Sequence, residues 1–194
     1  PYVADTKAAD RVGGADRNMD FVKQMQQQAL VLLKNENNIL PLDKRQIKKV
    51  LVTGPLADED NFMTSRYGPN GLETVTVLAG LRKYLKGIAE VDYAKGCDIV
   101  DAGWPATEIL PAPMSEQEKH GIAEAVAKAG ESDVIIAVLG EDEYRTGESR
   151  SRTSLDLPGR QQQLLEALHA TGKPVILVLI NGHPLTVNWA NAYI

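Results

Sequence analysis

The feature that most constrains the fold is the run 133–140, which is apolar from Val134 to Leu139 and rich in β-branched residues. A short apolar run without alternation is typical of a strand buried on both faces, as in parallel sheets. Similar runs occupy residues 49–55, 87–93 and 175–180. With helical segments between them, these four runs predict an α/β fold, a layered sandwich with a mostly parallel sheet covered by helices on both faces.

Helical patterns occupy the connections between these runs. Ser115 and Glu118 have the spacing of a capping box, which predicts a helix that begins there and continues through Ala129. Further helices are expected over residues 75–85 and 159–170. Each predicted strand after the first therefore follows a helix, which is the order required to build a parallel sheet.

The first part of the chain has a different character. A helix is expected from Asn18, an N-cap candidate. Its apolar positions follow the helical spacing: Phe21, Val22, Met25, Ala29, Leu30 and Leu33. Residues 1–17 are polar and lack periodicity, so we predict an interdomain linker there and an α/β sandwich domain over residues 18–194. The sequence begins with Pro1 rather than with methionine, and it ends at Ile194, just after an apolar strand and without a polar tail. We therefore expect both ends to be cut from something longer and the sandwich to be truncated at its C-terminus.

Composition and charge exclude several function classes. The net charge is -5 and the isoelectric point is about 5.3, which argues against nucleic acid or an anionic membrane as partner. The basic cluster Lys44, Arg45, Lys48 and Lys49 is interpreted as a solvated connector. No apolar run is long enough to span a membrane and no signal sequence begins the chain. The single Cys97 excludes an intrachain disulfide and a multi-cysteine metal site, and no cofactor is implied.

Chemistry is expected in the loops that follow the strands, because ligands of open parallel sheets bind beyond the carboxyl ends. The loop after Gly140 is the most charged. Residues 141–152 contain four acids and three arginines: Glu141, Asp142, Glu143, Glu148, Arg145, Arg150 and Arg152. A solvated charged loop is one interpretation. In the other, Glu148 at the far point of the loop acts in acid/base chemistry, and Glu141 beside the strand orients the loop or contacts substrate hydroxyls.

The sequence lacks the motifs of nucleotide-binding proteins, α/β-hydrolases and histidine metal sites. Gly54-Pro55 is not part of a Gly-x-Gly-x-x-Gly fingerprint, and no Gly-x-Ser-x-Gly elbow occurs. The three histidines lack the spacing of metal ligands. His120 and His169 fall on predicted helices and are interpreted as surface residues, whereas His183 follows a strand end and is a candidate for lining a site. Trp104 either stacks on a sugar ring or covers an apolar patch.

Several motifs in register resemble the C-terminal domain of glycoside hydrolase family 3, closest to its bacterial β-glucosidase and β-xylosidase-like members. They cover nearly the whole chain: residues 28–35, 40–42, 49–58, 76–81, the Gly140-Glu141 loop with Glu148-Ser149-Arg150-Ser151-Arg152, residues 155–159, 173–179 and 181–185. The sequence departs from the family at two strand ends. Leu56 stands where many members have Asn, and His183 stands where many have Arg.

The resemblance implies an (α/β)6 sandwich that follows a barrel domain, with the active site in the cleft between them. It further implies that the nucleophilic aspartate belongs to the barrel, which is absent from this sequence, and that the acid/base comes from the loop containing Glu148. Because that placement varies among subfamilies, Glu141 and Glu143 remain alternatives. Arg150, Arg152 and His183 are then candidates for substrate binding, with Arg150 or Arg152 also fixing the loop.

The leading hypothesis is a domain of a retaining, exo-acting β-glycosidase that is β-glucosidase-like, hydrolyses terminal O-glycosidic bonds and is inactive alone. Its partners would be a small glycoside and the N-terminal barrel domain, and the resemblance suggests a periplasmic or secreted bacterial protein. The main alternative is a non-catalytic domain that walls a carbohydrate pocket or has a structural role, with ion pairs stabilising the charged loop. A nucleotide-binding α/β module is a third hypothesis.

Overall fold

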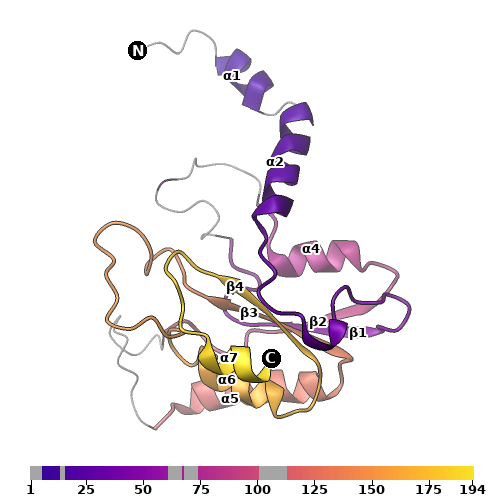
Figure 1. The fold of residues 1–194 in the computed structure, drawn as a ribbon, viewed down its shortest axis with the longest axis vertical. Helices are drawn as coiled ribbons and strands as arrows, with labels where there is room; N and C mark the ends of the chain where they lie inside the picture. The colour runs from indigo at the N-terminus through magenta and orange to yellow at the C-terminus, as the bar shows by residue number, and fades with distance from the viewer. Residues whose placement is uncertain (1–5, 14–15, 61–66, 68–73, 101–112) are drawn as a thin grey trace. The chain divides into compact units, whose positions relative to one another are not determined.

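The computed structural model describes residues 6–13, 16–60, 67, 74–100 and 113–194 (Figure 1). Contacts along the chain divide it into two compact units, Pro1–Pro41 and Leu42–Ile194. The candidate site lies in the second unit.

The first unit contains two α-helices and one short 3-10 helix: α1 (Thr6–Gly13), α2 (Asp16–Ala29) and η1 (Glu36–Asn38). The helix predicted to reach Leu33 ends at Ala29, so its expected C-terminal end is wrong. Residues 30–33 are 64–79% exposed, but Phe21 and Met25 within α2 are exposed as well, so burial does not explain where this helix ends. Residues 1–17, predicted as a linker, include α1, and their linker role stays a prediction.

The second unit is built on a sheet of four parallel strands (Figure 1). They are β1 (Lys49–Thr53), β2 (Glu90–Ala94), β3 (Val134–Gly140) and β4 (Val175–Ile180), in the order β2-β1-β3-β4. All seven residues of β3 are buried, as its continuous apolar character predicts. Strand β2 begins at Glu90 rather than at Gly87, because Gly87 has a positive φ of 76° and the backbone N–H groups of Ile88 and Ala89 bond to Leu85.

Helices cover both faces of this sheet. They are α4 (Val77–Tyr84), α5 (Glu116–Gly130), α6 (Gln161–His169) and α7 (Asn188–Tyr193). Figure 1 shows α4 on one face and α5, α6 and α7 on the other. The sheet residues divide accordingly, since Ile135 and Leu139 pack with the α5 and α6 side chains whereas Ile136 and Val138 pack with Leu78 of α4. The predicted layered α/β sandwich with a parallel sheet is therefore confirmed.

The start of α5 confirms the predicted capping box. The Ser115 hydroxyl accepts the Glu118 N–H at 3.2 Å, and the Glu118 carboxylate accepts the Ser115 N–H at 2.7 Å. Helix α7 was not expected, because its six residues are too few to show a helical period. Among the described residues no helix has both the length and the apolar character needed to cross a bilayer.

Candidate active site at the carboxyl edge of the sheet

The loops after the four strands lie at the same edge of the sheet, because all strands run in the same direction. Gly140 ends β3 with φ 138°, and a Cβ atom there would lie 1.8 Å from the carbonyl oxygen of Ile180 on β4. Only glycine allows β3 to pass so close to the neighbouring strand in this conformation. The charged loop, residues 141–158, therefore leaves the sheet from a fixed point.

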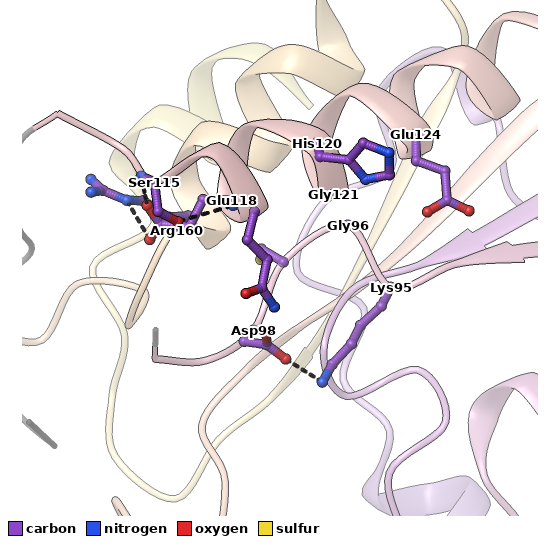
Figure 2. A pocket seen from close by; sticks show the side chains of 11 residues that line it. Lys95, Gly96, Asp98, Ser115, Glu118, His120, Gly121, Glu124 and Arg160 are labelled. Atoms are coloured by element: carbon purple, nitrogen blue, oxygen red, sulfur yellow. Dashed lines mark hydrogen bonds and ion pairs between the residues drawn. The ribbon is translucent and has the colours of Figure 1, made fainter. Parts of the chain in front are cut away.

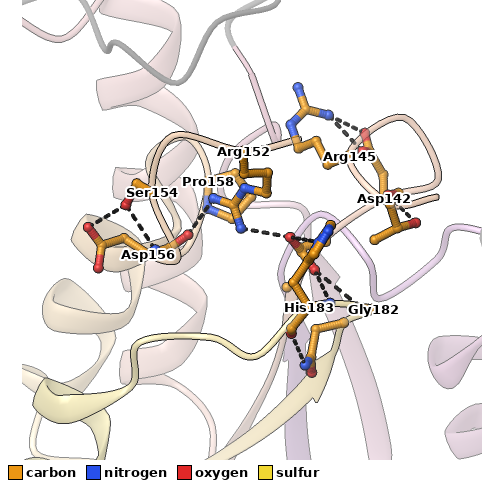
Figure 3. A network of polar contacts seen from close by, with 12 residues as sticks. Asp142, Arg145, Arg152, Ser154, Asp156, Pro158, Gly182 and His183 are labelled. Atoms are coloured by element: carbon orange, nitrogen blue, oxygen red, sulfur yellow. Dashed lines mark hydrogen bonds and ion pairs between the residues drawn. The ribbon is translucent and has the colours of Figure 1, made fainter. Parts of the chain in front are cut away.

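Glu141, the first residue of this loop, is anchored to two other segments. Its side chain is fully buried, and Oε1 accepts a hydrogen bond from the Arg152 guanidinium at 2.7 Å. Oε2 accepts the backbone N–H groups of Gly182 at 3.2 Å and His183 at 3.0 Å, and His183 Nδ1 lies 3.1 Å from Oε1. Figure 3 shows Arg152 and His183 approaching from different loops. The carboxylate thus joins the loops that follow β3 and β4.

These contacts determine the protonation of Glu141. Burial raises the pKa of a carboxyl group, but here the His183 N–H, the hydrogen bonds from Arg152 and His183 and the Arg152 charge outweigh it. The net effect is a pKa below the ordinary value of 4.5. Glu141 is therefore ionised near neutral pH and accepts hydrogen bonds, so it cannot donate a proton in this arrangement.

Arg152 connects Glu141 to the returning part of the loop. Its guanidinium also donates to the Asp156 carbonyl at 2.6 Å, and its side chain is only 4% exposed (Figure 3). Asp156 is in turn fixed by Ser154, whose hydroxyl bonds to the Asp156 carboxylate and accepts its N–H. A second pair, Arg145 with Asp142, is formed within one turn of the loop at 2.6 Å.

Glu148 lies on the exposed side of the same loop. Its backbone N–H donates to the Tyr67 hydroxyl at 2.9 Å. The neighbours on either side, Gly147 and Ser149, have positive φ values of 102° and 60°, which produce a tight turn that the Arg150 N–H closes onto the Gly147 carbonyl at 3.2 Å. Glu148 is therefore an exposed residue of this turn, whereas the Glu141 side chain is buried.

A separate hollow lies at the carboxyl end of β2, beside the start of α5 (Figure 2). Arg160 pairs there with Glu118 at 2.9 Å, and Lys95 pairs with Asp98. Burial raises the pKa of the Cys97 thiol to about 12, so it is protonated at neutral pH. Among the described residues no three His, Cys, Asp or Glu side chains are grouped as metal ligands.

The structure brings together three of the residues that the sequence singles out: Glu141, Arg152 and His183. Glu148 and Arg150 lie on the exposed part of the loop. Sequence reasoning missed the contacts of the Gly182 N–H and of the Asp156 carbonyl, because backbone donors and acceptors do not depend on residue type. It also missed the Tyr67 hydroxyl, because Tyr67 lies 81 residues before its partner Glu148. His169 is exposed and contacts Trp189, whereas Trp104 falls outside the described residues.

Fold and site together define a parallel α/β sandwich domain that presents a carboxylate-bearing loop at the carboxyl edge of its sheet. Residues 30–194 match the Glycosyl hydrolase family 3 C-terminal domain, and the chain belongs to this family.

Relatives of known type support this assignment. A β-xylosidase of Formosa agariphila is 38% identical over 97% of this chain, and a periplasmic β-glucosidase of Salmonella typhimurium is 37% identical over 94%. The solved structure of a β-glucosidase from Erythrobacter marinus is 36% identical and superposes with a TM-score of 0.76 over 91% of this chain. The chain spans only 25%, 24% and 25% of these proteins, respectively.

Proposed function

We propose that this chain is the domain that supplies the acid/base carboxyl group, Glu148, to a retaining exo-acting β-glycosidase whose nucleophile lies in another domain of the same protein. The observation that carries this proposal is the contrast between two glutamates of one loop. Glu141 is buried and ionised by its partners, whereas Glu148 is presented at the surface of an anchored turn.

In this mechanism Glu148 first donates its proton to the glycosidic oxygen while a carboxylate of the other domain attacks the anomeric carbon. It then removes a proton from the water that releases the sugar. A retaining reaction requires the two carboxyl groups about 5–5.5 Å apart. An exposed turn at the edge of the sheet leaves room for a second domain to approach Glu148 and exclude water from it.

Glu141, Arg152 and His183 have a positioning role in this proposal. Together they connect the loop that carries Glu148 to the loop after β4 through buried hydrogen bonds of 2.7–3.2 Å. Arg150 is exposed, and the His183 side chain is 32% exposed against 4% for Arg152, so Arg150 and His183 remain the candidates for contact with substrate hydroxyls.

The substrate class and the location follow from the relatives. The relatives include proteins described as β-xylosidases and as β-glucosidases, one of them periplasmic. We therefore propose a glycoside or small oligosaccharide with a terminal β-xylosyl or β-glucosyl unit as substrate, and a periplasmic or secreted protein.

The test compares Glu148→Gln with Glu143→Gln in the full-length protein. Glu143 is a matched control, because it is an acid of the same loop that the sequence left open as an alternative. Steady-state rates are measured on aryl glycosides whose leaving groups range from activated to poor. Loss of the acid should slow poor leaving groups by about 10²–10⁴-fold and activated ones far less. If Glu143→Gln shows this pattern and Glu148→Gln does not, the assignment is wrong.

The ion pairs of the loop favour a second candidate, a domain that only walls the sugar pocket. Glu141 with Arg152 and Asp142 with Arg145 stabilise the loop whether or not it takes part in catalysis. In that case Glu148→Gln would slow activated and poor substrates alike, since only binding or shape would be lost.

A further inference from the structure

Gln161 is a polar side chain that is fully buried at the base of the charged loop. Its Oε1 accepts the Gly140 N–H at 2.7 Å, and its Nε2 donates to the Gly140 carbonyl at 2.8 Å and to the Pro158 carbonyl at 2.9 Å. A buried amide with three hydrogen bonds to backbone groups is specific in geometry. It joins the residue where the loop leaves β3 to the residue where it returns towards α6.

The sheet explains why Gly140 needs this partner. Strand β1 ends at Thr53, which pairs with Ala137, so β3 extends beyond it. On the other side Gly140 pairs with Ile180, and the next N–H, that of Glu141, bonds to the Ile180 carbonyl. The Gln161 amide presents one acceptor and one donor to Gly140, as a neighbouring strand would. Without it, a buried N–H and a buried C=O would lack partners.

We propose that Gln161 is a positioning residue for Glu148, an inference that rests on the proposed function. The contact between Glu141 and Arg152 ties the start of the loop to its middle, whereas Gln161 ties the residue before the loop, Gly140, to its last residue, Pro158. Release of the ends lets the turn at residues 147–150 shift relative to the sheet. A displacement of about 1 Å at a reacting group lowers rates by about 100-fold, because the productive geometry is lost.

Only a carboxamide of this length fits the three contacts. A glutamate lacks the Nε2 donor and would place a carboxylate against two carbonyl oxygens. Methionine has a similar volume but makes none of the hydrogen bonds. Asparagine keeps the amide, but its side chain is one methylene shorter, so the amide would lie further from the Gly140 and Pro158 backbone. These differences separate a positioning role from simple filling of the core.

The experiment uses Gln161→Met in the full-length protein, alone and combined with Glu148→Gln. Gln162→Met is the matched control, since Gln162 lies next to Gln161 on α6 and its side chain donates to the exposed Glu166 carboxylate. Rates are measured on aryl glycosides with poor and activated leaving groups. We expect Gln161→Met to lower kcat on poor leaving groups by about 10- to 100-fold, to affect activated ones less, and to leave KM close to that of Gln162→Met.

The double variant Gln161→Met with Glu148→Gln tests whether Gln161 acts through Glu148. If Gln161 acts through Glu148, then Gln161→Met causes little further loss once Glu148→Gln is present. An equal loss in both backgrounds, or equal slowing of all substrates, would overturn the proposal. If Glu148→Gln itself shows no dependence on the leaving group, the proposed function fails and not merely this inference. Should Gln161→Met not fold, Gln161→Asn replaces it and is judged by the same double variant.

Discussion

Replacement of Arg152 by methionine tests the buried anchor of the loop. The substitution keeps the apolar stem and removes the charge that faces Glu141, whose side chain is fully buried. Removing one partner of a buried ion pair costs about 3–5 kcal/mol, because the other charge is left uncompensated. Glu141 still accepts the N–H groups of Gly182 and His183 in this variant. We therefore expect the free energy of unfolding to fall by about 3 kcal/mol, the lower end of that range.

Thermal unfolding of the chain, followed by circular dichroism, measures this loss. A change of about 3 kcal/mol lowers the Tm of a domain of this size by about 6–12 °C. The matched control is Arg145→Met, which breaks a pair with Asp142 whose side chains are 12% and 18% exposed. That pair is less buried than Glu141 with Arg152, so its loss should lower the Tm less. The double variant Glu141→Gln with Arg152→Met leaves no unpaired charge and should recover most of the stability.

The pH dependence of stability gives a second test of the contact between Glu141 and Arg152. The folded-state pKa of Glu141 is lowered below 4.5, so its contribution to stability is present above the unfolded pKa and is lost as pH falls through the folded pKa. Without Arg152 the burial remains, and the pKa should rise. The difference between the parent and Arg152→Met should therefore be largest near neutral pH and should shrink on acidification, first as the carboxyl group of the variant is protonated and then as that of the parent is. Equal effects of Arg152→Met and Arg145→Met, or a difference that grows on acidification, would refute this reasoning.

Three further predictions concern the strand end, the chain in isolation and the cysteine. Gly140→Ala should destabilise the domain by about 3 kcal/mol or more in thermal unfolding, since a Cβ atom would lie 1.8 Å from the Ile180 carbonyl oxygen. Gly87→Ala, with nothing within 4 Å, should cost only about 1–2 kcal/mol. Under the proposed function, the chain alone should not hydrolyse aryl β-glucosides or β-xylosides, whereas its mixture with the domain that carries the nucleophile should; activity of the chain alone would place both carboxyl groups in these residues. Cys97, with its pKa raised to about 12, should react with a thiol reagent only after denaturation, and rapid labelling of the native chain at neutral pH would contradict its burial.

The elements that could be predicted from sequence are those whose signals do not depend on distant residues. Strand β3 is buried on both faces, and its continuous apolar run indicates this directly. The start of α5 follows from side chains three residues apart. The end of α2 could not be predicted, because apolar residues continue at helical spacing beyond Ala29, and the short α7 has too few residues to show a period.

The candidate site was predictable only as a loop. Composition placed acids and arginines together after β3 but did not distinguish the environments of Glu141 and Glu148. That difference depends on Arg152 within the same loop and on His183, which lies 42 residues further along the chain. The contact that closes the loop, Gln161 with Gly140, joins residues from a helix and a strand and has no local pattern.

The contrast between the two glutamates leads to one consequence for acid catalysis. A carboxyl group that donates a proton near neutral pH needs a raised pKa, whereas Glu141 has a lowered one because Arg152 and two backbone N–H groups stabilise its charge. The described part of this loop offers Glu148 no comparable burial, since it lies exposed on its turn. Under the proposed function, the second domain supplies the burial that Glu148 lacks on its exposed turn. Domain closure would then both bring the nucleophile and complete the acid, which explains why this chain alone should be inert.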